Sequence, residues 1–264
     1  MPTDDSFFAW VGFILKEYWP MFLSGVGSTL LVALTGTVLG FLIGLLVAIV
    51  RTIPIAPNAP AWKKVILKTL HGLMGVYIEV FRGTPMIVQA MVIYYGAMQF
   101  LSLDLSVTST AIFIVSINTG AYMAEIIRGG ILSIDRGQRE ASVSIGLTHW
   151  QMMTGVVLPQ AVRNIMPSIG NEFIVNIKDS SVLNVISLSE LYFTSKSVAG
   201  TYYRYFEVFF ITAMIYLFLT FTITRLLRLL EKKMDGPQHY TIHGSQSYSK
   251  AEIKVDESEV LPND

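Results

Sequence analysis

Long uncharged stretches alternate with short charged connections along this chain. No charged residue occurs from Tyr18 to Val50, and the part from Leu30 to Val50 is almost wholly apolar. A bilayer core about 30 Å thick is crossed by a helix of about 20 apolar residues. The pattern therefore predicts a membrane-spanning helix, which we place at residues 22–50.

Four more stretches fit the same criterion of span length. We place these spans at residues 76–101, 106–127, 165–193 and 205–230. The span at 165–193 has the weakest pattern because four charged residues interrupt it: Glu172, Lys178, Asp179 and Glu190. The predicted fold is an all-α, polytopic membrane protein with about five transmembrane helices, which together form one domain over residues 22–233.

The two ends of the chain depart from this pattern. Residues 1–21 mix aromatic side chains with Lys16 and Glu17, which is typical of an amphipathic helix at the membrane interface. Residues 234–264 are polar and have few apolar side chains to bury, so we expect a disordered tail.

Basic residues indicate which way the spans face. Lys and Arg gather in residues 51–68, 128–163 and 225–233, whereas the opposite side holds only Lys16, Lys196 and Arg204. Cytoplasmic connections carry the excess of Lys and Arg. We therefore expect the N-terminal segment outside the cell and the C-terminal tail in the cytoplasm.

Composition agrees with a membrane protein and excludes several functions. Of the residues, 52% are hydrophobic and only 14% are charged, against roughly 25% charged in soluble domains. The 19 basic residues balance the 19 acidic ones, which gives no reason to expect nucleic acid as a partner. There is no cysteine, and the four histidines lack metal-ligand spacing. We expect no metal site and no enzyme active site.

The third connection, residues 132–164, has an organised pattern. Asp135 can cap a helix that begins near Arg136, and Gly146 can end it in the left-handed conformation. Thr148 and Gln151 have capping-box spacing for a second short helix, which we expect Pro159 to close. The connection is therefore predicted to be two short helices with a sharp turn, at the cytoplasmic face.

Glycines on the first span predict close helix packing. Gly36, Gly40 and Gly44 are four residues apart and lie on one helix face. Small residues at this spacing let two membrane helices approach closely. We expect this face to pack against another span or another subunit.

The third connection resembles the conserved loop of ABC importer permeases. The resemblance rests on Glu140-Ala141-Ser142, then Gly146, then Val156 followed by Leu158-Pro159; Ser142 and Val156 are conservative departures. Three other segments are similar to the polar amino-acid uptake branch of that family, the histidine/glutamine-type permeases: Glu79–Pro85, Gly120–Ile131 and Lys178–Ser181.

The resemblance implies a division of labour among subunits. The chain would be the transmembrane domain of a type I ABC importer in a bacterial cell membrane, and would itself bind no cofactor. A cytoplasmic ABC ATPase dimer would bind ATP and Mg²⁺, an extracytoplasmic solute-binding protein would deliver a polar amino acid, and a second permease, the same or related, would complete the pore. The residues implied in coupling to the ATPase are Arg139, Glu140, Ala141, Gly146, Leu158 and Pro159.

Polar residues at apolar depth suggest a substrate pocket, since ionised groups there are costly and tend to be functional or paired. The carboxylate of an amino acid could bind Arg82 or Lys178, and its ammonium group Glu125 or Asp179. The neutral candidates are Thr84, Gln89, Asn118 and Tyr122. The alternative is that these charges only pair helices and position them at the interface.

Two other functions compete with an ABC importer. An ion-coupled secondary transporter or a channel would need an ion pathway within one chain, and would not explain the pattern from Glu140 to Pro159. A structural or receptor-like membrane scaffold would not co-purify with an ATPase.

Overall fold

The structure is a computed structural model that describes residues 6–53, 55, 59–235, 241–243 and 252–254. Its helices are α1 (Phe7–Thr52), α2 (Ala61–Gly83), α3 (Met86–Leu101), α4 (Val107–Leu132), α5 (Arg136–Ser144), α6 (His149–Met152), α7 (Leu158–Asp179), α8 (Leu191–Tyr202) and α9 (Tyr205–Asp235). A π-helical turn, η1 (Met153–Val157), joins α6 to α7, and a 3₁₀ helix, η2 (Ser180–Ile186), follows α7.

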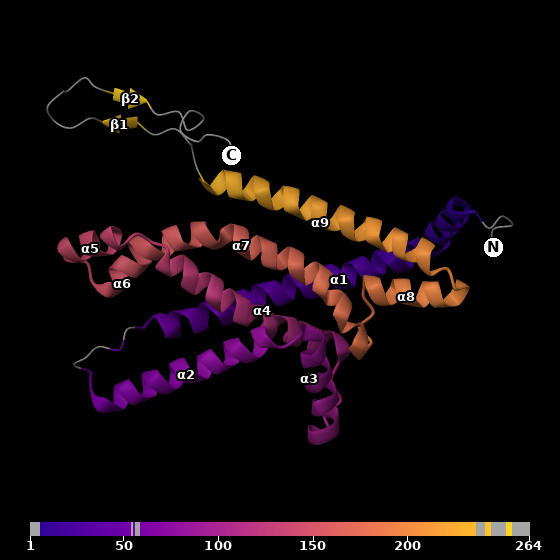
Figure 1. The fold of residues 1–264 in the computed structure, drawn as a ribbon, viewed down its shortest axis with the longest axis horizontal. Helices are drawn as coiled ribbons and strands as arrows, with labels where there is room; N and C mark the ends of the chain where they lie inside the picture. Colours follow the sequence, from indigo (N-terminus) through magenta and orange to yellow (C-terminus); the bar gives the residue numbers. More distant parts are fainter. Residues whose placement is uncertain (1–5, 54, 56–58, 236–240, 244–251, 255–264) are drawn as a thin grey trace.

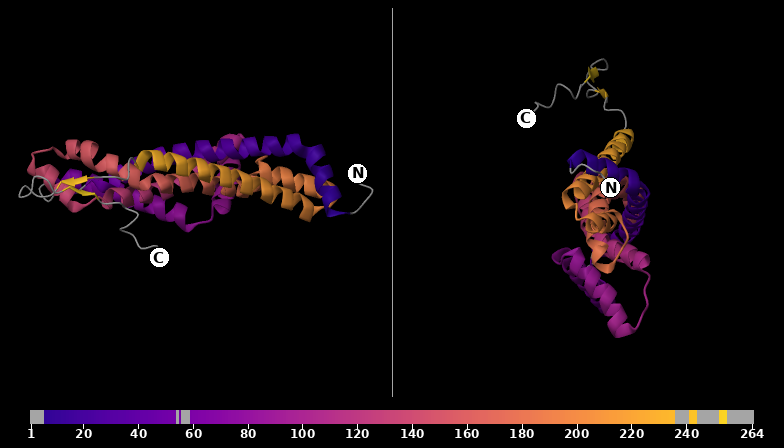
Figure 2. Two further views of the ribbon diagram at one scale, coloured as in Figure 1. Left: turned by 90° about the horizontal axis from the view of Figure 1, so that it is seen from above. Right: turned by 90° about the vertical axis from the view of Figure 1, so that its right-hand side faces the viewer.

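The long helices form one elongated bundle (Figure 1). Helices α1, α2, α4, α7 and α9 run lengthwise, whereas α3 projects from the middle of the bundle roughly perpendicular to them. The short helices α5 and α6 lie at one end of the bundle, and α8 lies at the other end with the N-terminus (Figures 1 and 2). The bundle therefore has two distinct ends, one formed by α5 and α6 and the other by α8.

Helix α1 is longer than the first predicted span. It runs without a break for 46 residues and contains Pro20, which corresponds to about 70 Å at 1.5 Å per residue. The predicted division at residues 21 and 22 is therefore not a helix boundary, although α1 bends near its N-terminal end (Figure 2). Trp10 and Ile14 are buried in a cluster with residues of α8 and α9. This packing holds the N-terminal segment on the bundle and offsets the backbone hydrogen bond that Pro20 removes.

The expected glycine packing is present between α1 and α4. Gly36 faces Val115, Gly40 faces Thr119 and Gly44 faces Met123. A Cβ added at Gly44 would lie 2.8 Å from the backbone nitrogen of Ala124. Because backbone atoms set this limit, the two helices could not make room by changing a rotamer.

We expect Gly44→Ala to destabilise the protein, because it would force α1 away from α4. Overpacking of this kind costs about 1–3 kcal/mol, which thermal unfolding in lipid nanodiscs would detect as a lower midpoint. Gly27→Ala is the matched control: it lies on the same helix with nothing within 4 Å of the added Cβ. An equal loss of stability in both variants would contradict this account.

Two predicted spans are not single helices. The span at 76–101 is divided into α2 and α3, which are bent by 110° at the break. Thr84 has an extended backbone and Pro85 precedes α3, as expected because proline disfavours a helical conformation in the residue before it. The span at 165–193 consists of the end of α7, then η2, a short connection and the start of α8.

Three helices in the described part of the chain are long and apolar enough to cross a membrane: α1, α4 and α9. The bent pair α2 and α3 makes a fourth candidate if it is one span. Helix α7 carries Glu172, Lys178 and Asp179, and it does not reach the same hydropathy. The five crossings expected from the sequence therefore depend on α7, and that number stays a prediction.

Part of the predicted tail has regular structure. Strands β1 (Thr241–His243) and β2 (Glu252–Lys254) pair antiparallel, with Ile242 opposite Ile253. Isoleucine and threonine favour strands, so these two segments depart from the expected disorder. The rest of residues 236–264 lies outside the described residues.

Candidate functional site

The connection between α4 and α7 forms the helix pair that the sequence predicts. The Asp135 side chain accepts a hydrogen bond from the Gly137 nitrogen at 2.6 Å and caps α5. Gly146 then takes a left-handed conformation, with φ of 80°. Its nitrogen donates to the Val143 carbonyl at 2.9 Å, and the next nitrogen, of Leu147, donates to the Ser142 carbonyl at 3.1 Å. These bonds close the end of α5 and set the direction in which the chain leaves it.

The predicted capping box is also present. The Thr148 nitrogen donates to Gln151 Oε1 at 2.9 Å, and the Gln151 nitrogen donates to Thr148 Oγ1 at 3.3 Å. The expectation that Pro159 closes this second helix is wrong. The helical chain continues from α6 through η1 into α7, where Pro159 lies in the first turn. Proline is tolerated there because a first-turn nitrogen needs no helical partner.

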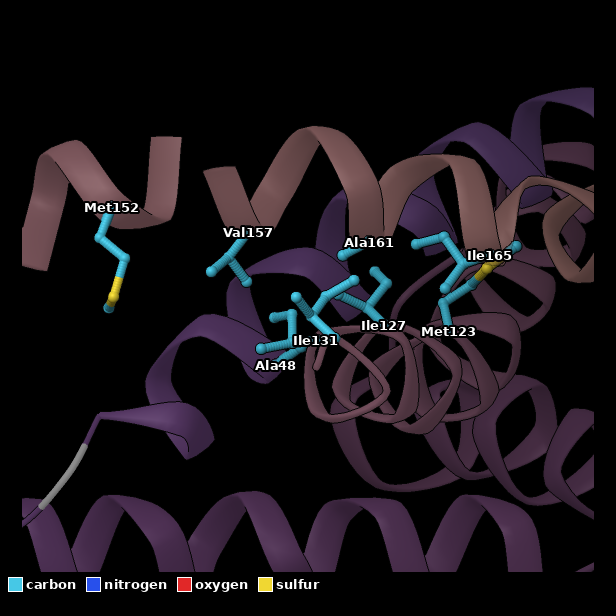
Figure 3. Close-up of a cluster of buried hydrophobic side chains, with 9 residues drawn as sticks. Ala48, Met123, Ile127, Ile131, Met152, Val157, Ala161 and Ile165 are labelled. Carbon is cyan, nitrogen blue, oxygen red and sulfur yellow. The ribbon is translucent and has the colours of Figure 1, made fainter. Parts of the chain in front are cut away.

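A buried apolar cluster fixes this loop to the bundle (Figure 3). Met152 and Val157 come from α6 and η1, and they belong to one cluster with Ile127 and Ile131 of α4 and Ala48 of α1. Leu158 packs against the same cluster and is half-buried. The loop is therefore a packed part of the domain, and a displacement of α6 would be transmitted directly to α4 and α7.

The outer face of the loop carries exposed apolar side chains. Val143 is 64% exposed, Ile145 77% and Trp150 75%. Ala141 is exposed beside them, and Arg136 Nε pairs with Glu140 Oε1 at 2.8 Å on the surface of α5. Exposed apolar side chains of this kind, on a loop that also carries exposed charges, are typical of a protein-docking surface. Among the residues that the resemblance implies in coupling, Glu140, Ala141 and Gly146 lie on this surface.

Arg139 points the other way, toward the end of α4. Its Nη2 donates to the Ile131 carbonyl, whereas its buried Nε has no hydrogen-bond partner among the described residues. A cation at the C-terminal end of a helix is favourable because of the helix dipole. Arg139 therefore joins the loop to α4 by a polar contact, in addition to the apolar cluster.

At the break between α2 and α3, two amide side chains meet the freed backbone carbonyls. Gln89 Nε2 lies 2.9 Å from the carbonyls of both Phe81 and Thr84. Asn118 Nδ2 donates to the Phe81 carbonyl at 3.2 Å and to Gln89 Oε1 at 2.9 Å. Thr84 Oγ1 accepts from Gln89 Nε2 at 2.9 Å. Three neutral residues predicted for the pocket, Thr84, Gln89 and Asn118, are thus brought together here.

Arg82 lies beside the break, 5.4 Å from the centre of the Tyr122 ring. This cation–π contact replaces the pair with Glu79 that the helical spacing allows; no ion pair joins Arg82 to Glu79 in the described structure. Cation–π contacts leave the edge of the guanidinium available for other acceptors. The structure therefore brings two predicted pocket residues together, one from α2 and one from α4.

Glu125 has a different environment from the one predicted for it. It pairs with Arg51 of α1 and, at 2.8 Å, with Arg128 of its own helix. The i, i+3 spacing of Glu125 and Arg128 allows their pairing, but Arg51 lies too far away in the sequence to be identified. Because two cations already offset this carboxylate, the cluster favours helix pairing over recognition of an ammonium group.

One acidic residue of α7, Glu172, lies within electrostatic range of Arg82. Glu172 interacts electrostatically with Arg82 and Asp179, and it lines an open hollow of about 390 Å³ between α4 and α7 with Ile126 and Asn171. Lys178 and Asp179 are the last residues of α7 and are exposed. Glu172 was absent from the predicted pocket, although its charge within an apolar span was the signal that could have identified it.

A second buried polar cluster was also missed. Asn176 Nδ2 lies 2.8 Å from Thr37 Oγ1 and 3.0 Å from Thr119 Oγ1, so it links α7 to α1 and α4. All three side chains are buried. Nothing in their spacing predicts the contact, because each comes from a different helix.

Comparison with known proteins places this architecture in a family. Residues 62–236 match the model of the family described as binding-protein-dependent transport system inner membrane component. The chain is 36% identical over 216 residues to the glutamine transport system permease protein GlnP of Escherichia coli (strain K12), covering 81% of this chain and 93% of that one. It is 32% identical to the arginine transport system permease protein ArtQ of Bacillus subtilis (strain 168), covering 82% and 94%.

Solved structures of ABC transporters agree with this family assignment. A crystal structure of an amino acid ABC transporter with histidines has a chain that is 37% identical, with a TM-score of 0.76, covering 88% of this chain and all of that one (100%). An inward-facing structure of the MetNI methionine ABC transporter is 19% identical with a TM-score of 0.68, covering 82% and 97%, and supports the fold alone.

These matches confirm the predicted all-helical importer permease fold. They identify a multi-pass inner-membrane transport subunit that is not itself an enzyme and that depends on a separate ATPase. They give no support to the alternative of a stand-alone secondary transporter or channel. The chain belongs to the family of inner-membrane components of binding-protein-dependent transport systems.

Proposed function

We propose that this permease imports polar L-amino acids by alternating access, driven by an ATPase that docks on α5 and α6. The observation that carries the proposal is the course of α4. This single helix holds Asn118 and Tyr122 beside Arg82 in its middle, and its end accepts the hydrogen bond from Arg139 of α5. A force on α5 therefore reaches the polar residues through one rigid element.

The charges around Arg82 fit a zwitterion. The Arg82 guanidinium would bind the α-carboxylate, since arginine presents paired donors that match carboxylate geometry. Glu172 or Asp179 of α7 would receive the α-ammonium group. We no longer assign that role to Glu125, because Arg51 and Arg128 already offset its charge. Relatives named for glutamine and arginine transport support a polar amino acid as the cargo.

The proposed assembly has outside and inside partners. The end of the bundle with α5 and α6 would face the cytoplasm, where an ATPase dimer binds. The end with α8 and the N-terminus would face outward and receive a solute-binding protein. A second permease, a copy or a relative, would supply the second docking loop that an ATPase dimer needs.

Reconstitution tests this function. We expect vesicles that contain the permease and its ATPase, with the solute-binding protein on the delivering side, to move radiolabelled L-glutamine or L-arginine only when ATP is hydrolysed. Vesicles without ATP are the control. Transport driven by an ion gradient in the absence of ATP would instead support the secondary transporter.

Cysteine labelling tests the orientation, because the chain has no cysteine of its own. Ile145 follows α5 and Tyr203 follows α8, both residues are exposed, and the two helices lie at opposite ends of the bundle (Figure 1). In intact cells, a membrane-impermeant maleimide should label Tyr203→Cys but reach Ile145→Cys only after the membrane is opened. The reverse pattern would invert the proposed topology.

A further inference from the structure

The break between α2 and α3 leaves backbone carbonyls inside the bundle without helical partners. Side chains of two helices, α3 and α4, donate hydrogen bonds to these carbonyls. Gln89 of α3 reaches back to the carbonyls of Phe81 and Thr84, both at 2.9 Å. Asn118 of α4 reaches the Phe81 carbonyl at 3.2 Å and the Gln89 oxygen at 2.9 Å. An unpaired carbonyl in a membrane domain is costly, so these bonds stabilise the break in its bent form.

The side-chain amides of Gln89 and Asn118 already form hydrogen bonds within the protein. Gln89 is only 7% exposed. Its nitrogen has three acceptors within 2.9 Å, and its oxygen accepts from Asn118. The Asn118 nitrogen is likewise shared between two acceptors. Neither amide nitrogen is available to a ligand in this conformation, so the contacts do not favour the predicted substrate contact for either residue.

The side-chain amides of Gln89 and Asn118 bind the backbone next to Arg82, the residue proposed to bind the substrate carboxylate. Arg82 directly follows Phe81, the residue whose carbonyl both amides contact. Tyr122 lies one helical turn after Asn118 on α4, and its ring lies under the Arg82 guanidinium at 5.4 Å. The same contact therefore sets the last turn of α2 against α4 at the point where the guanidinium and the ring meet.

We propose that Gln89 and Asn118 are positioning residues that hold Arg82 over Tyr122 for recognition of a substrate carboxylate. This inference rests on the proposed function, in which Arg82 binds that carboxylate. Without the clamp formed by Gln89 and Asn118, the end of α2 is free to move relative to α4. Arg82 would keep its charge but lose its fixed place, and recognition of the carboxylate would weaken.

The test measures equilibrium binding to the purified permease–ATPase complex without the solute-binding protein, so that only the permease contributes selectivity. The probes are radiolabelled L-glutamine or L-arginine and the corresponding α-amides, which lack the carboxylate. We expect Arg82→Gln to weaken binding of the amino acid by about tenfold or more, the effect of losing a charged hydrogen bond, and to change binding of the amide little. Asn118→Leu should also weaken binding of the amino acid more than binding of its α-amide. Gln89→Met, which removes the other amide of the pair, should have the same effect.

A double-mutant cycle separates positioning from general damage. If Asn118 acts through Arg82, the variant with both Asn118→Leu and Arg82→Gln should bind like Arg82→Gln alone, since residues that share one interaction are not additive. Additive losses, or equal weakening of the acid and the amide by Asn118→Leu, would overturn the inference. Asn118→Asp, which keeps the shape, replaces Asn118→Leu if the latter fails to assemble.

Asn184→Leu is the matched control. This substitution removes a partly buried side-chain amide, whose nitrogen donates to the nearby Ser181 carbonyl at 2.7 Å. It should therefore leave the preference for the amino acid over its α-amide unchanged. A loss of that preference in Asn184→Leu equal to that in Asn118→Leu would overturn the inference. If Arg82→Gln itself does not alter the preference, the proposed carboxylate site fails, and the positioning role fails with it.

Discussion

Gly146→Val is expected to abolish coupled uptake while the permease still inserts and assembles. Gly146 has φ of 80°, a left-handed conformation, and no atom lies within 4 Å of an added Cβ. The added Cβ therefore meets no described atom within 4 Å, and the main effect comes from the left-handed backbone. A left-handed conformation costs an L-residue about 1–2 kcal/mol, and a β-branched side chain is least tolerated there.

That strain acts on the angle between α5 and α6. The bonds from the nitrogens of Gly146 and Leu147 end α5 only if Gly146 is left-handed. If valine moves to an ordinary conformation, α6 leaves α5 in a new direction, and the exposed patch of Val143, Ile145 and Trp150 is dispersed. We expect uptake in reconstituted vesicles to fall by at least about tenfold, equivalent to 1.4 kcal/mol, while ATP hydrolysis persists.

Gly155→Val is the matched control for this result. Gly155 lies in the same connection, is exposed and also has open space around an added Cβ, but its backbone is not left-handed. It should retain most of the uptake. Normal uptake by Gly146→Val, or equal losses in both variants, would show that the turn at Gly146 does not set the coupling geometry.

The connection between α4 and α7 could be predicted from the sequence because its signals are local. Asp135, Gly146 and the pair of Thr148 and Gln151 each act on backbone within a few residues. Only the end of the second helix was wrong. Proline signals a helix start as well as a stop, and the π-helical turn before Pro159 lets the chain continue into α7.

The bundle interior was less predictable because its contacts are between helices. The spacing of Gly36, Gly40 and Gly44 predicted a close approach but not its partner, which is α4. The apolar run over residues 76–101 predicted one continuous span, whereas the chain bends by 110° at Thr84 and Pro85. Once α3 turns away, Gln89 meets the carbonyls of its own break, so residues predicted to contact substrate are used to hold the backbone.

The partners of charged residues are equally hard to predict when they lie on different helices. A spacing of three residues on a helix allows Arg82 to pair with Glu79 and Arg128 to pair with Glu125. Only the second pair is present, because Tyr122 of α4 offers Arg82 another contact. Long-range partners such as Arg51 for Glu125 depend on which helices become neighbours, and periodicity within one helix does not contain that information.

The second large effect is expected at Arg139. Arg139→Met keeps a long side chain against the bundle but removes the cation that caps the Ile131 carbonyl. A charged donor of this kind contributes about 1.5–3 kcal/mol when it is well placed. Arg139 is only partly buried, so we expect a value at the lower end. Helix α5 would then be held to the bundle mainly through its contacts with α6 and η1, which the apolar cluster fixes to α4.

The expected result is a split between binding and coupling. ATPase association should persist, because Val143, Ile145 and Trp150 remain exposed, but uptake per ATP hydrolysed should fall several-fold as α5 moves without carrying α4. The measurement is simultaneous recording of uptake and phosphate release from the same vesicles.

Arg136→Met is a stringent control because it makes the same chemical change three residues away on the same helix. The Arg136 side chain is 91% exposed and pairs with Glu140 at an i, i+4 spacing, a surface interaction worth about 0.3–0.5 kcal/mol. If coupling depends on the link to α4, Arg136→Met should leave uptake per ATP nearly unchanged. If both variants uncouple equally, charge on the docking face is the important property, and α4 is moved through the apolar cluster around Ile131 instead.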